Sequence, residues 1–384
     1  MEQSPQESPT PSHPPRYDRF RSWRDYLKRQ PVVGYIGYLG YDNFGDELLF
    51  AAIARLFPQQ MIAYDGATET VHRDPKYYLR KRLRAYRLLK PKLYNGVLLG
   101  GGTLINREAF LSRLQQAMRR YPTATFGTGV CEPQFWQRYH PAVDHVTLMQ
   151  RWANTLRDIS YLSVRGPHSA QTLQTYGLEA QMIGDPALSI GALRGSYRRT
   201  RRVAINVGSH GIQRGDQSTI TQTVQRLCFA LHRQGWWVEF LALNDIDWEA
   251  ITQISSAMTE AFKRPFPCTQ ATGIGTTLAH IKTCDVLIGQ RLHAVVAAHA
   301  CGVPAIALSY APKCDDYMAS MGLDLFAMRT DSLTPTEPCV AELLARMTWL
   351  SDRYSDHCQQ VRDKVTEYQR LQASAAQTIT EKFT

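Results

Sequence analysis

The clearest pattern of hydrophobic and polar positions lies in residues 284–313. Residues 285–289 form a short apolar run, typical of a buried parallel strand, and residues 304–310 form a second one. The apolar sequence RLHAVVAAHAC between them is expected to be the crossover helix, which Gly302 and Pro304 end. This stretch therefore predicts one complete βαβ unit.

Similar short apolar runs alternate with helical patterns in two series along the chain. The first series predicts strands at 32–37, 60–64, 96–99, 124–127, 161–164 and 182–184, and the second at 203–208, 237–243, 285–289 and 305–309. Strands that alternate with helices favour doubly wound parallel sheets. We therefore predict an α/β protein with two Rossmann-like doubly wound domains facing a cleft and a helical C-terminal extension.

The boundaries follow from composition. The polar and basic segment 191–202 separates the two series, so we expect an N-terminal domain at 31–192 and a C-terminal domain at 203–335. Residues 1–30 are proline-rich and polar and are predicted to be a flexible tail. Residues 336–384 carry apolar positions at helical spacing and are predicted to be C-terminal helices.

Composition narrows the class of protein. The apolar fraction of 44% is normal for a globular protein, and 384 residues suit two cores. The polar N-terminus lacks the apolar segment of a secretory signal, and no run approaches the ~18 apolar residues of a membrane span. The eight cysteines are scattered without metal-ligand spacing, so we expect reduced thiols, a cytoplasmic location and no metal site.

The formal net charge of +10 points to anionic partners. Residues 76–92 contain eight Lys or Arg residues and no acid, and Leu79, Leu83 and Tyr86 recur at helical spacing beside arginines. Two interpretations are equally open: a helix on an anionic membrane surface, which would place the protein peripherally at the inner face of the membrane, or a solvated helix face. Nucleic acid is not expected, because no nucleic-acid-binding motif is present.

Basic residues occur at several predicted strand-to-helix turns. Arg291 and His293 follow one strand, Lys313 follows the next, and Arg165 precedes a proline that suits a first helical position. Ligands bind at this edge of parallel sheets, and backbone N–H groups at helix starts favour anions. The simpler interpretations are a solvated arginine, a histidine packed in the core, or an ion pair between Arg165 and Asp185.

Glycine-rich turns accompany these basic residues. The spacing of Gly34, Gly37 and Gly40 does not match the dinucleotide fingerprint, so no nucleotide is inferred from it. The three glycines at 100–102 allow a turn that a ligand can approach closely. Asn43 or Asp46 is expected to cap the first helix.

Taken together, these turns resemble those of the polysaccharide pyruvyl transferase family. The matching motifs occur in the family's order and cover most of residues 32–326: GYIGYLGYDNFGDELL, LLGGGTLIN, SVRGPHSAQTLQTYGL, IGDPAL and IGQRLHAVVAAHACGVPAIALSYAPK. The resemblance implies a fold like that of two-domain GT-B glycosyltransferases. It also implies transfer of pyruvate from phosphoenolpyruvate onto two hydroxyls of a sugar in a cell-surface glycan or its lipid-linked precursor, forming a ketal.

By this resemblance Arg165, Arg291 and His293 match family positions for donor binding and catalysis. Our hypothesis assigns His293 as proton donor, and Arg165 and Arg291 as clamps on carboxylate and phosphate, because arginine is the better fork for planar anions. His299 lies six residues, roughly 120°, further round the helix and is expected to be structural. The resemblance implies phosphoenolpyruvate as a co-substrate, and no other cofactor is expected. The residues expected to line the substrates are Lys313, Gly101, Gly102, Asn43, Asp46 and Asp185.

One position departs from the family's pattern. The family commonly has an acid shortly after the glycine turn, where this chain has Asn106, so Asp42, Asp46 or Glu132 is expected to activate the acceptor hydroxyl, or the acceptor differs. Two other functions stay open at this point. One is a GT-B-like glycosyltransferase that uses a nucleotide sugar. The other is a non-catalytic, membrane-associated protein of glycan assembly.

Overall fold

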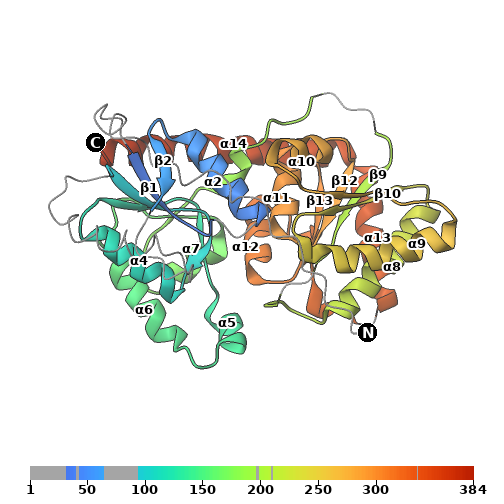
Figure 1. Cartoon of the computed structure of the whole chain (residues 1–384), viewed down its shortest axis with the longest axis horizontal. Coiled ribbons are helices and arrows are strands. Elements are labelled where there is room, and N and C mark those ends of the chain that lie inside the picture. Colours follow the sequence, from blue (N-terminus) through green and yellow to red (C-terminus); the bar gives the residue numbers. More distant parts are fainter. Residues whose placement is uncertain (1–31, 40–42, 65–93, 196–198, 209–210, 335) are drawn as a thin grey trace, which may run out of the picture.

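The computed structural model describes residues 32–39, 43–64, 94–195, 199–208, 211–334 and 336–384. The predicted tail at 1–30, the basic segment at 76–92 and Asp42 lie outside these ranges. Within them the chain forms two α/β domains that lie side by side (Figure 1). This arrangement agrees with the predicted fold class.

The N-terminal domain is built on parallel strands. One sheet has the order β2-β1-β3-β5 and the other β4-β6-β7-β8, and every ladder in them is parallel. β4 follows β3 after two glycines, and β6 follows β5 after Phe126 and Gly127, so the two sheets are one layer bent along these breaks. The strands are β1 (Val32–Ile36), β2 (Gln60–Ala63), β3 (Gly96–Leu99), β4 (Gly102–Ile105), β5 (Thr123–Thr125), β6 (Thr128–Val130), β7 (Ser163–Val164) and β8 (Gln181–Met182).

Glycine is required at the bend between β3 and β4. A Cβ on Gly100 would collide with the ring of Tyr35, and one on Gly101 would come within 2.6 Å of the Leu49 side chain. Gly102 has a φ of +96°, a conformation that L side chains rarely adopt. The sheet can therefore bend here, and its backbone can pass close to the side chains of Tyr35 and Leu49.

The helices of this domain begin where the strands end. Asn43 caps α2, because its side chain accepts from the Gly45 N–H at 3.1 Å. This result selects one of the two residues that the sequence offered as the cap. The helices are α2 (Phe44–Leu56), α4 (Glu108–Met118), α5 (Pro133–Tyr139), α6 (His145–Leu156), α7 (Pro167–Gln174) and the short 3-10 helix η2 (Pro186–Ser189).

The C-terminal domain contains one parallel sheet of order β11-β10-β9-β12-β13-β14. The strand order reverses between β9 and β12, and in open α/β sheets ligands bind beyond the carboxyl ends of strands at such a point. Its strands are β9 (Arg202–Asn206), β10 (Trp237–Ala242), β11 (Cys268–Gln270), β12 (Val286–Gly289), β13 (Ala305–Ser309) and β14 (Ala327–Arg329).

Helices connect these strands on both faces. They are α8 (Gln217–Arg233), η3 (Asp245–Asp247), α9 (Trp248–Phe262), α10 (Ile274–Ile281), α11 (Leu292–Ala300), α12 (Pro312–Met321), η4 (Asp324–Phe326) and η5 (Thr330–Ser332). The βαβ unit predicted in residues 284–313 is confirmed as β12, α11 and β13.

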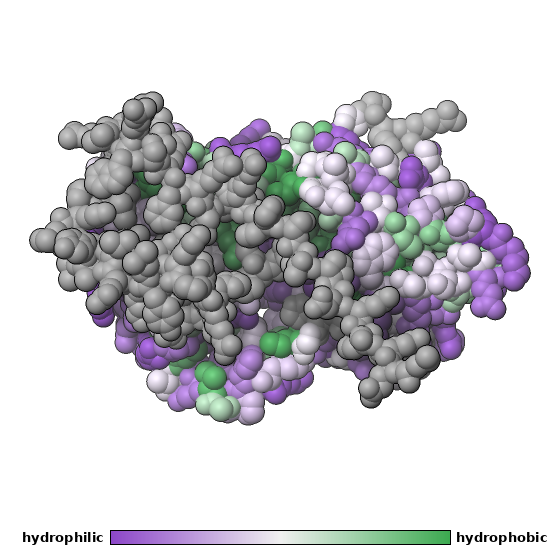
Figure 2. All heavy atoms as spheres, viewed as in Figure 1, coloured by the Kyte–Doolittle hydropathy of each residue, from purple (hydrophilic) through white to green (hydrophobic). Residues whose placement is uncertain are grey.

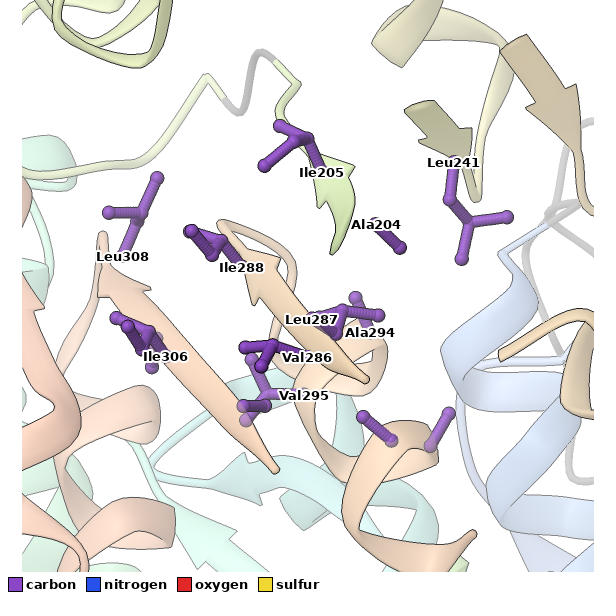
Figure 3. Close-up of a cluster of buried hydrophobic side chains, with 14 of the residues drawn as sticks. Ala204, Ile205, Leu241, Val286, Leu287, Ile288, Ala294, Val295, Ile306 and Leu308 are labelled. Atoms are coloured by element: carbon purple, nitrogen blue, oxygen red, sulfur yellow. The ribbon is translucent and has the colours of Figure 1, made fainter. Parts of the chain in front are cut away.

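Figure 3 shows why this unit forms the centre of the domain. The side chains of β12 and β13, including Leu287, Ile288 and Ile306, lie among those of α11 and β9 and are fully buried. Each fully buried aliphatic side chain contributes about 1.5–3 kcal/mol through the hydrophobic effect. A continuous apolar run suits a strand that is covered on both faces.

The chain ends in two helices, α13 (Thr336–Asp352) and α14 (Tyr354–Lys382). α14 runs back from the C-terminal domain to the N-terminal domain (Figure 1). At its start Tyr354 is buried in the core of the C-terminal domain, and near its end Ile379 and Phe383 are buried with Val33 of β1. α14 therefore fixes how the two domains sit relative to each other.

The surface shown in Figure 2 is mainly hydrophilic over the described part of the C-terminal domain, with small separate apolar patches. Exposed apolar side chains such as Val146 and Leu325 lie on different elements. Among the described residues, none of the helices combines the length and the apolar composition that crossing a bilayer requires.

Candidate functional site

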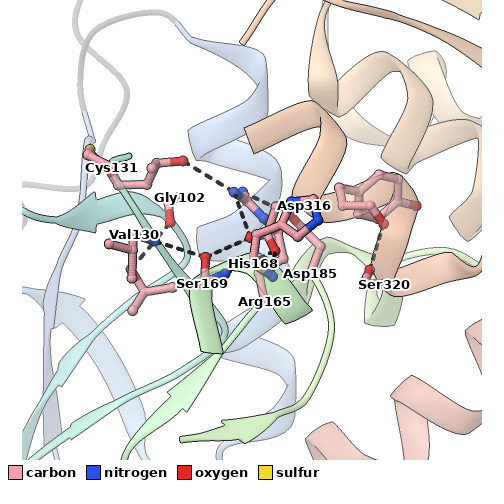
Figure 4. A network of polar contacts seen from close by, with 12 residues as sticks. Gly102, Val130, Cys131, Arg165, His168, Ser169, Asp185, Asp316 and Ser320 are labelled. Atoms are coloured by element: carbon pink, nitrogen blue, oxygen red, sulfur yellow. Dashed lines mark hydrogen bonds and ion pairs between the residues drawn. The ribbon is translucent and has the colours of Figure 1, made fainter. Parts of the chain in front are cut away.

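Four of the predicted residues lie where the two domains meet. Arg165 follows β7 and Asp185 follows β8 in the N-terminal domain, whereas His293 and Lys313 lie in the first turns of α11 and α12. Figure 4 shows this polar region, with Arg165 and Asp185 opposite Asp316 of α12. The charges of Arg165 and Lys313 both act on His293, so these three form one electrostatic group.

Arg165 is almost completely buried, with 1% of its side chain exposed. Its Nη1 lies 3.7 Å from Asp185 Oδ2, its Nη2 lies 3.9 Å from Asp316 Oδ2, and Nη2 donates to Thr103 Oγ1 at 3.3 Å. Its Nε and Nη1 have no hydrogen-bond partner in the structure. A buried guanidinium with unused donors has a strong tendency to bind an anion.

His293 packs between the two domains. Its Nε2 lies 3.8 Å from Asp185 Oδ2, and its ring covers Gly45, where any side chain would collide with Nδ1. Burial, together with the charges of Lys313 and Arg165, lowers the pKa of His293 to about 3. The imidazole is therefore neutral at neutral pH when no anion is bound.

Asp185 links the two sides of this group. Its Oδ1 accepts from the Ala187 N–H at 2.9 Å and caps η2, while its Oδ2 faces Arg165 and His293. Burial raises the pKa of Asp185, and the Arg165 guanidinium opposes that rise. The ion pair with Arg165 expected from the sequence is present, at a loose distance.

Lys313 connects this group to Arg291. Its Nζ lies 4.9 Å from the ring centroid of Tyr310, and both Lys313 and Arg291 act on the pKa of that phenol, which burial raises. Lys313 also acts on His293 and on Asp46. Its charge therefore acts on side chains of both domains.

Arg291 contacts a different carboxylate from those around Arg165. Its Nε and Nη2 donate to Asp247 Oδ1 at 2.7 and 2.5 Å, and its backbone N–H donates to Asn206 Oδ1 at 2.9 Å. Asp247 is fully buried. This ion pair lies at the point where the strand order of the C-terminal domain reverses, and no sequence pattern indicated Asp247 as the partner.

Asp46 lies beside the glycine turn. Its Oδ2 accepts from Asn43 Nδ2 at 2.5 Å, and a Cβ on Gly102 would be 3.7 Å from its Oδ1. Burial raises the pKa of Asp46 to about 7, although Lys313 and Arg107 oppose the rise. Asn43, Asp46 and Gly102 are thus brought together, whereas Gly101 faces Leu49 and serves the packing of the bend.

Sequence reasoning missed Asp316. This carboxylate of α12 accepts from the N–H groups of His168 and Ser169 at 2.9 and 3.2 Å and from Ser169 Oγ at 2.6 Å, so it caps α7 of the other domain (Figure 4). The signal available was an acidic pair at residues 315–316, two positions after Lys313. It could not be interpreted, because the partner lies 147 residues away in the sequence.

Arg107 was missed as well. It follows β4, at the same kind of turn as Arg165, and its guanidinium lies 4.8 Å from the ring centroid of Trp136 and 6.0 Å from that of Tyr38. Its charge acts on Asp46. The position after the motif LLGGGTLIN was the signal that could have identified it.

Asn106, which stands where an acid is common in the family, is buried and has a φ of 68°. Its Nδ2 donates to the Cys131 carbonyl at 3.1 Å. A carboxylate could not make this bond, and asparagine tolerates a positive φ better than most residues. Of the three alternative acids, Asp42 is outside the described residues. The charges of Lys313 and Arg107 act on Asp46, whereas the charge of Glu132 acts on Arg329.

Another group of potential ligands lies at the amino-terminal edge of the C-terminal sheet. Glu239 Oε1 is 3.1 Å from both His280 Nε2 and Cys284 Sγ, and Glu239 Oε2 accepts from Arg202 at 2.6 Å. These three side chains are close enough to hold a metal ion. Hydrogen bonds among them and the Arg202 ion pair already account for the arrangement.

The fold is shared with nucleotide-sugar enzymes. A UDP-glucosyltransferase from Polygonum tinctorium matches with a TM-score of 0.55 and 11% identity over 92% of this chain and 99% of that one. UDP-GlcNAc 2-epimerases from Neisseria meningitidis (TM-score 0.53, 9% identity, 91% and 98% covered) and Methanocaldococcus jannaschii (0.51, 10%, 83% and 91%) match similarly. At such low identity these likenesses support the GT-B-like fold alone.

Comparison by sequence gives the family. No curated protein matches the chain significantly. The family model described as polysaccharide pyruvyl transferase matches residues 43–312, a range that contains the glycine turn, Arg165, Asp185, Arg291 and His293. The family predicted from the motifs is therefore confirmed, and the protein is a transferase that belongs to the polysaccharide pyruvyl transferase family.

Proposed function

We propose that this protein transfers pyruvate from phosphoenolpyruvate to two hydroxyls of one sugar and forms a ketal. The observation that carries the proposal is Arg165, a buried arginine with two unused donor groups, placed beside His293 and Lys313 of the other domain. Phosphoenolpyruvate carries a phosphate and a carboxylate, so its site needs several fixed cations. Arg165 and Lys313 supply them from both sides.

The proposed roles follow from this placement. Arg165 binds the carboxylate or the phosphate by its planar fork, and Lys313 binds the other anion as a point charge. Arg291 acts as a further clamp on the side of Tyr310, where its charge and that of Lys313 meet. When the donor's phosphate leaves, these cations stabilise the developing negative charge.

His293 becomes protonated only when the donor is bound. Its pKa of about 3 in the ligand-free protein results from burial and two nearby cations. A bound anion with several negative charges offsets those cations and raises that pKa. As the proposed proton donor, His293 would therefore take up its proton together with phosphoenolpyruvate.

The acceptor is proposed to be a sugar of a cell-surface glycan, either nucleotide-linked or attached to a lipid precursor. In the second case the reaction takes place at the inner face of the membrane, and the basic segment 76–92 is proposed to bind anionic lipids there. Binding to vesicles containing anionic lipid tests this point. A variant with Arg80, Arg84 and Arg87 changed to Glu should lose binding, and equal binding by both proteins would remove the membrane proposal.

The function is tested by incubating the pure protein with phosphoenolpyruvate and a set of lipid-linked and nucleotide-linked sugars. Phosphate release and a gain of mass on the sugar should appear together. Phosphoenolpyruvate should also raise the melting temperature. A rise with UDP-sugars alone, and sugar transfer in place of phosphate release, would instead favour a nucleotide-sugar glycosyltransferase. Normal turnover by a His293→Ala, Arg291→Ala double variant would contradict the proposed site.

A further inference from the structure

Asp46 is placed between cations of both domains. It lies in the first turn of α2, next to Gly45, which is covered by the ring of His293. Lys313 approaches its charge from the C-terminal domain, and Arg107 from the N-terminal domain. The carboxyl therefore lies near His293 and Lys313 and beside the turn at Gly102.

We infer that Asp46 is a catalytic residue of the pyruvyl transfer and carries the proton between the acceptor sugar and the donor. This inference rests on the proposed function. Neither the fold nor the family assignment specifies this role. Asn106, at the position where the family commonly has an acid, cannot ionise, so another group has to take the proton.

The first step needs one group that gives a proton to C3 of phosphoenolpyruvate and one that takes the proton of the first sugar hydroxyl. The protonated His293 gives its proton to C3 while the hydroxyl oxygen bonds to C2, and the C2–C3 double bond becomes a single bond. The Asp46 carboxylate takes the proton of that hydroxyl. Asp46 then passes this proton to His293, whose ring covers the neighbouring Gly45, so both residues return to their starting states.

The second step closes the ketal. The oxygen of the second hydroxyl bonds to C2, and the bond between C2 and the phosphate oxygen breaks. The proton of the second hydroxyl leaves with inorganic phosphate. Both hydroxyl protons are thus accounted for, one in the new methyl group and one on phosphate, and no oxidant or further reactant is needed.

The surroundings of Asp46 suit this role. Burial raises its pKa to about 7, so both protonation states are populated at neutral pH. Lys313 and Arg107 favour the carboxylate, whereas Glu47 and Asp185 favour the acid. Tyr35 also lies near Asp46, and burial keeps this phenol protonated.

The test is the variant Asp46→Asn. Asn43 can still donate to the remaining side-chain oxygen, so the fold should persist. We expect kcat for phosphate release to fall by about 100-fold or more, the usual size of a general acid–base contribution, while the Kd for phosphoenolpyruvate changes less than threefold. The limb of the pH–kcat profile near pH 7 should disappear, and Asp46→Glu should recover part of the activity.

Glu47→Gln is the matched control, because it removes the same charge from the next residue of the same helix. It should keep kcat within about twofold and keep the pH limb, shifted to slightly lower pH because the Glu47 charge favours the acid form of Asp46. If Asp46→Asn retains the wild-type kcat, or loses activity only through weaker donor binding, Asp46 is not the proton carrier. If the wild type releases no phosphate with any sugar, the proposed function fails and this assignment fails with it.

A second measurement does not depend on turnover. Between pH of about 4 and 7 the folded wild type keeps a proton on Asp46 that the unfolded chain has lost, so this group makes wild-type stability fall as pH rises. Asparagine cannot ionise. The melting temperature of Asp46→Asn relative to wild type should therefore rise between pH 5 and 8, and a constant difference would overturn the assignment.

Discussion

Arg165 and Arg291 occupy the same kind of position in the two domains, yet their surroundings differ. Each follows a strand and begins a turn into a helix. Arg165 has two carboxylates at 3.7 and 3.9 Å and two donor groups without a hydrogen-bond partner. Arg291 donates twice to Asp247 at 2.5–2.7 Å.

The difference separates two functions of an arginine. A guanidinium held by short bonds to one buried carboxylate stabilises the fold around it, because each charge needs the other. A guanidinium that is buried with unused donors keeps them for an incoming anion. Under the proposed function, we therefore expect the larger contribution to donor binding from Arg165 and the larger contribution to stability from Arg291.

The largest expected effect is the loss of activity in Arg165→Gln. Losing the buried fork for the donor's anion should reduce kcat/KM for phosphoenolpyruvate by about 1,000-fold, which corresponds to about 4 kcal/mol. Phosphate release measures the rate, and the donor should no longer raise the melting temperature. Arg157→Gln, an exposed arginine of the same domain, should behave as wild type. If kcat/KM falls by less than tenfold, Arg165 does not contribute more to donor binding than Arg291.

Arg291→Gln should have the second largest effect, and mainly on stability. It leaves the buried Asp247 carboxylate without its cation, which costs on the order of 3 kcal/mol of unfolding free energy. Urea unfolding of this variant and of Arg165→Gln compares the two positions directly. If Arg291→Gln unfolds at the wild-type urea concentration and loses donor binding, Arg291 belongs in the same class as Arg165.

Asp316→Asn should act in opposite directions on stability and on donor binding. The weaker cap on α7 should lower stability by about 1 kcal/mol. Removing a negative charge 3.9 Å from Arg165 should lower the KM for phosphoenolpyruvate about threefold, an estimate based on the size of screened charge interactions. Calorimetry and initial rates measure the two quantities. A higher KM would mean that Asp316 instead positions Arg165 for binding.

The smallest expected effect is on the pH dependence of stability. Arg165 lowers the pKa values of His293 and Asp185, so its removal lets the folded protein take up protons at higher pH. The stability of Arg165→Gln should therefore improve relative to wild type as pH falls from 7 to 5, by about 1.4 kcal/mol for each unit of pKa change. Melting curves at several pH values measure it. In Arg157→Gln, which removes an exposed arginine away from this group, the pH dependence should match that of wild type.

His299 shows where sequence reasoning was adequate. It was expected to be structural because it faces away from His293 on α11. In the structure it is fully buried, and its Nδ1 lies 2.8 Å from the Tyr317 hydroxyl. Helical periodicity alone separated these two histidines, since it is a local property of the chain.

Partners distant in the sequence could not be predicted in this way. Asp247, Asp316 and Arg107 each lie near a predicted turn, but nothing local indicates which cation or helix each one meets. The pKa of Asp46 was also beyond reach, because it depends on burial and on a lysine 267 positions further along the chain.

The sequence by itself determined the alternation of strands and helices, the βαβ unit of residues 284–313 and the turns that carry Arg165, Arg291 and His293, because apolar periodicity and glycine and proline positions act locally. Only the tertiary structure decided how these turns work together. Packing α11 and α12 against α2 and α7, with α14 across both domains, places charges from distant segments in one buried region. This region has little access to solvent, so the distances between the charges have large effects. They decide which guanidinium N–H groups stay without a hydrogen-bond partner and which carboxyl group keeps its proton.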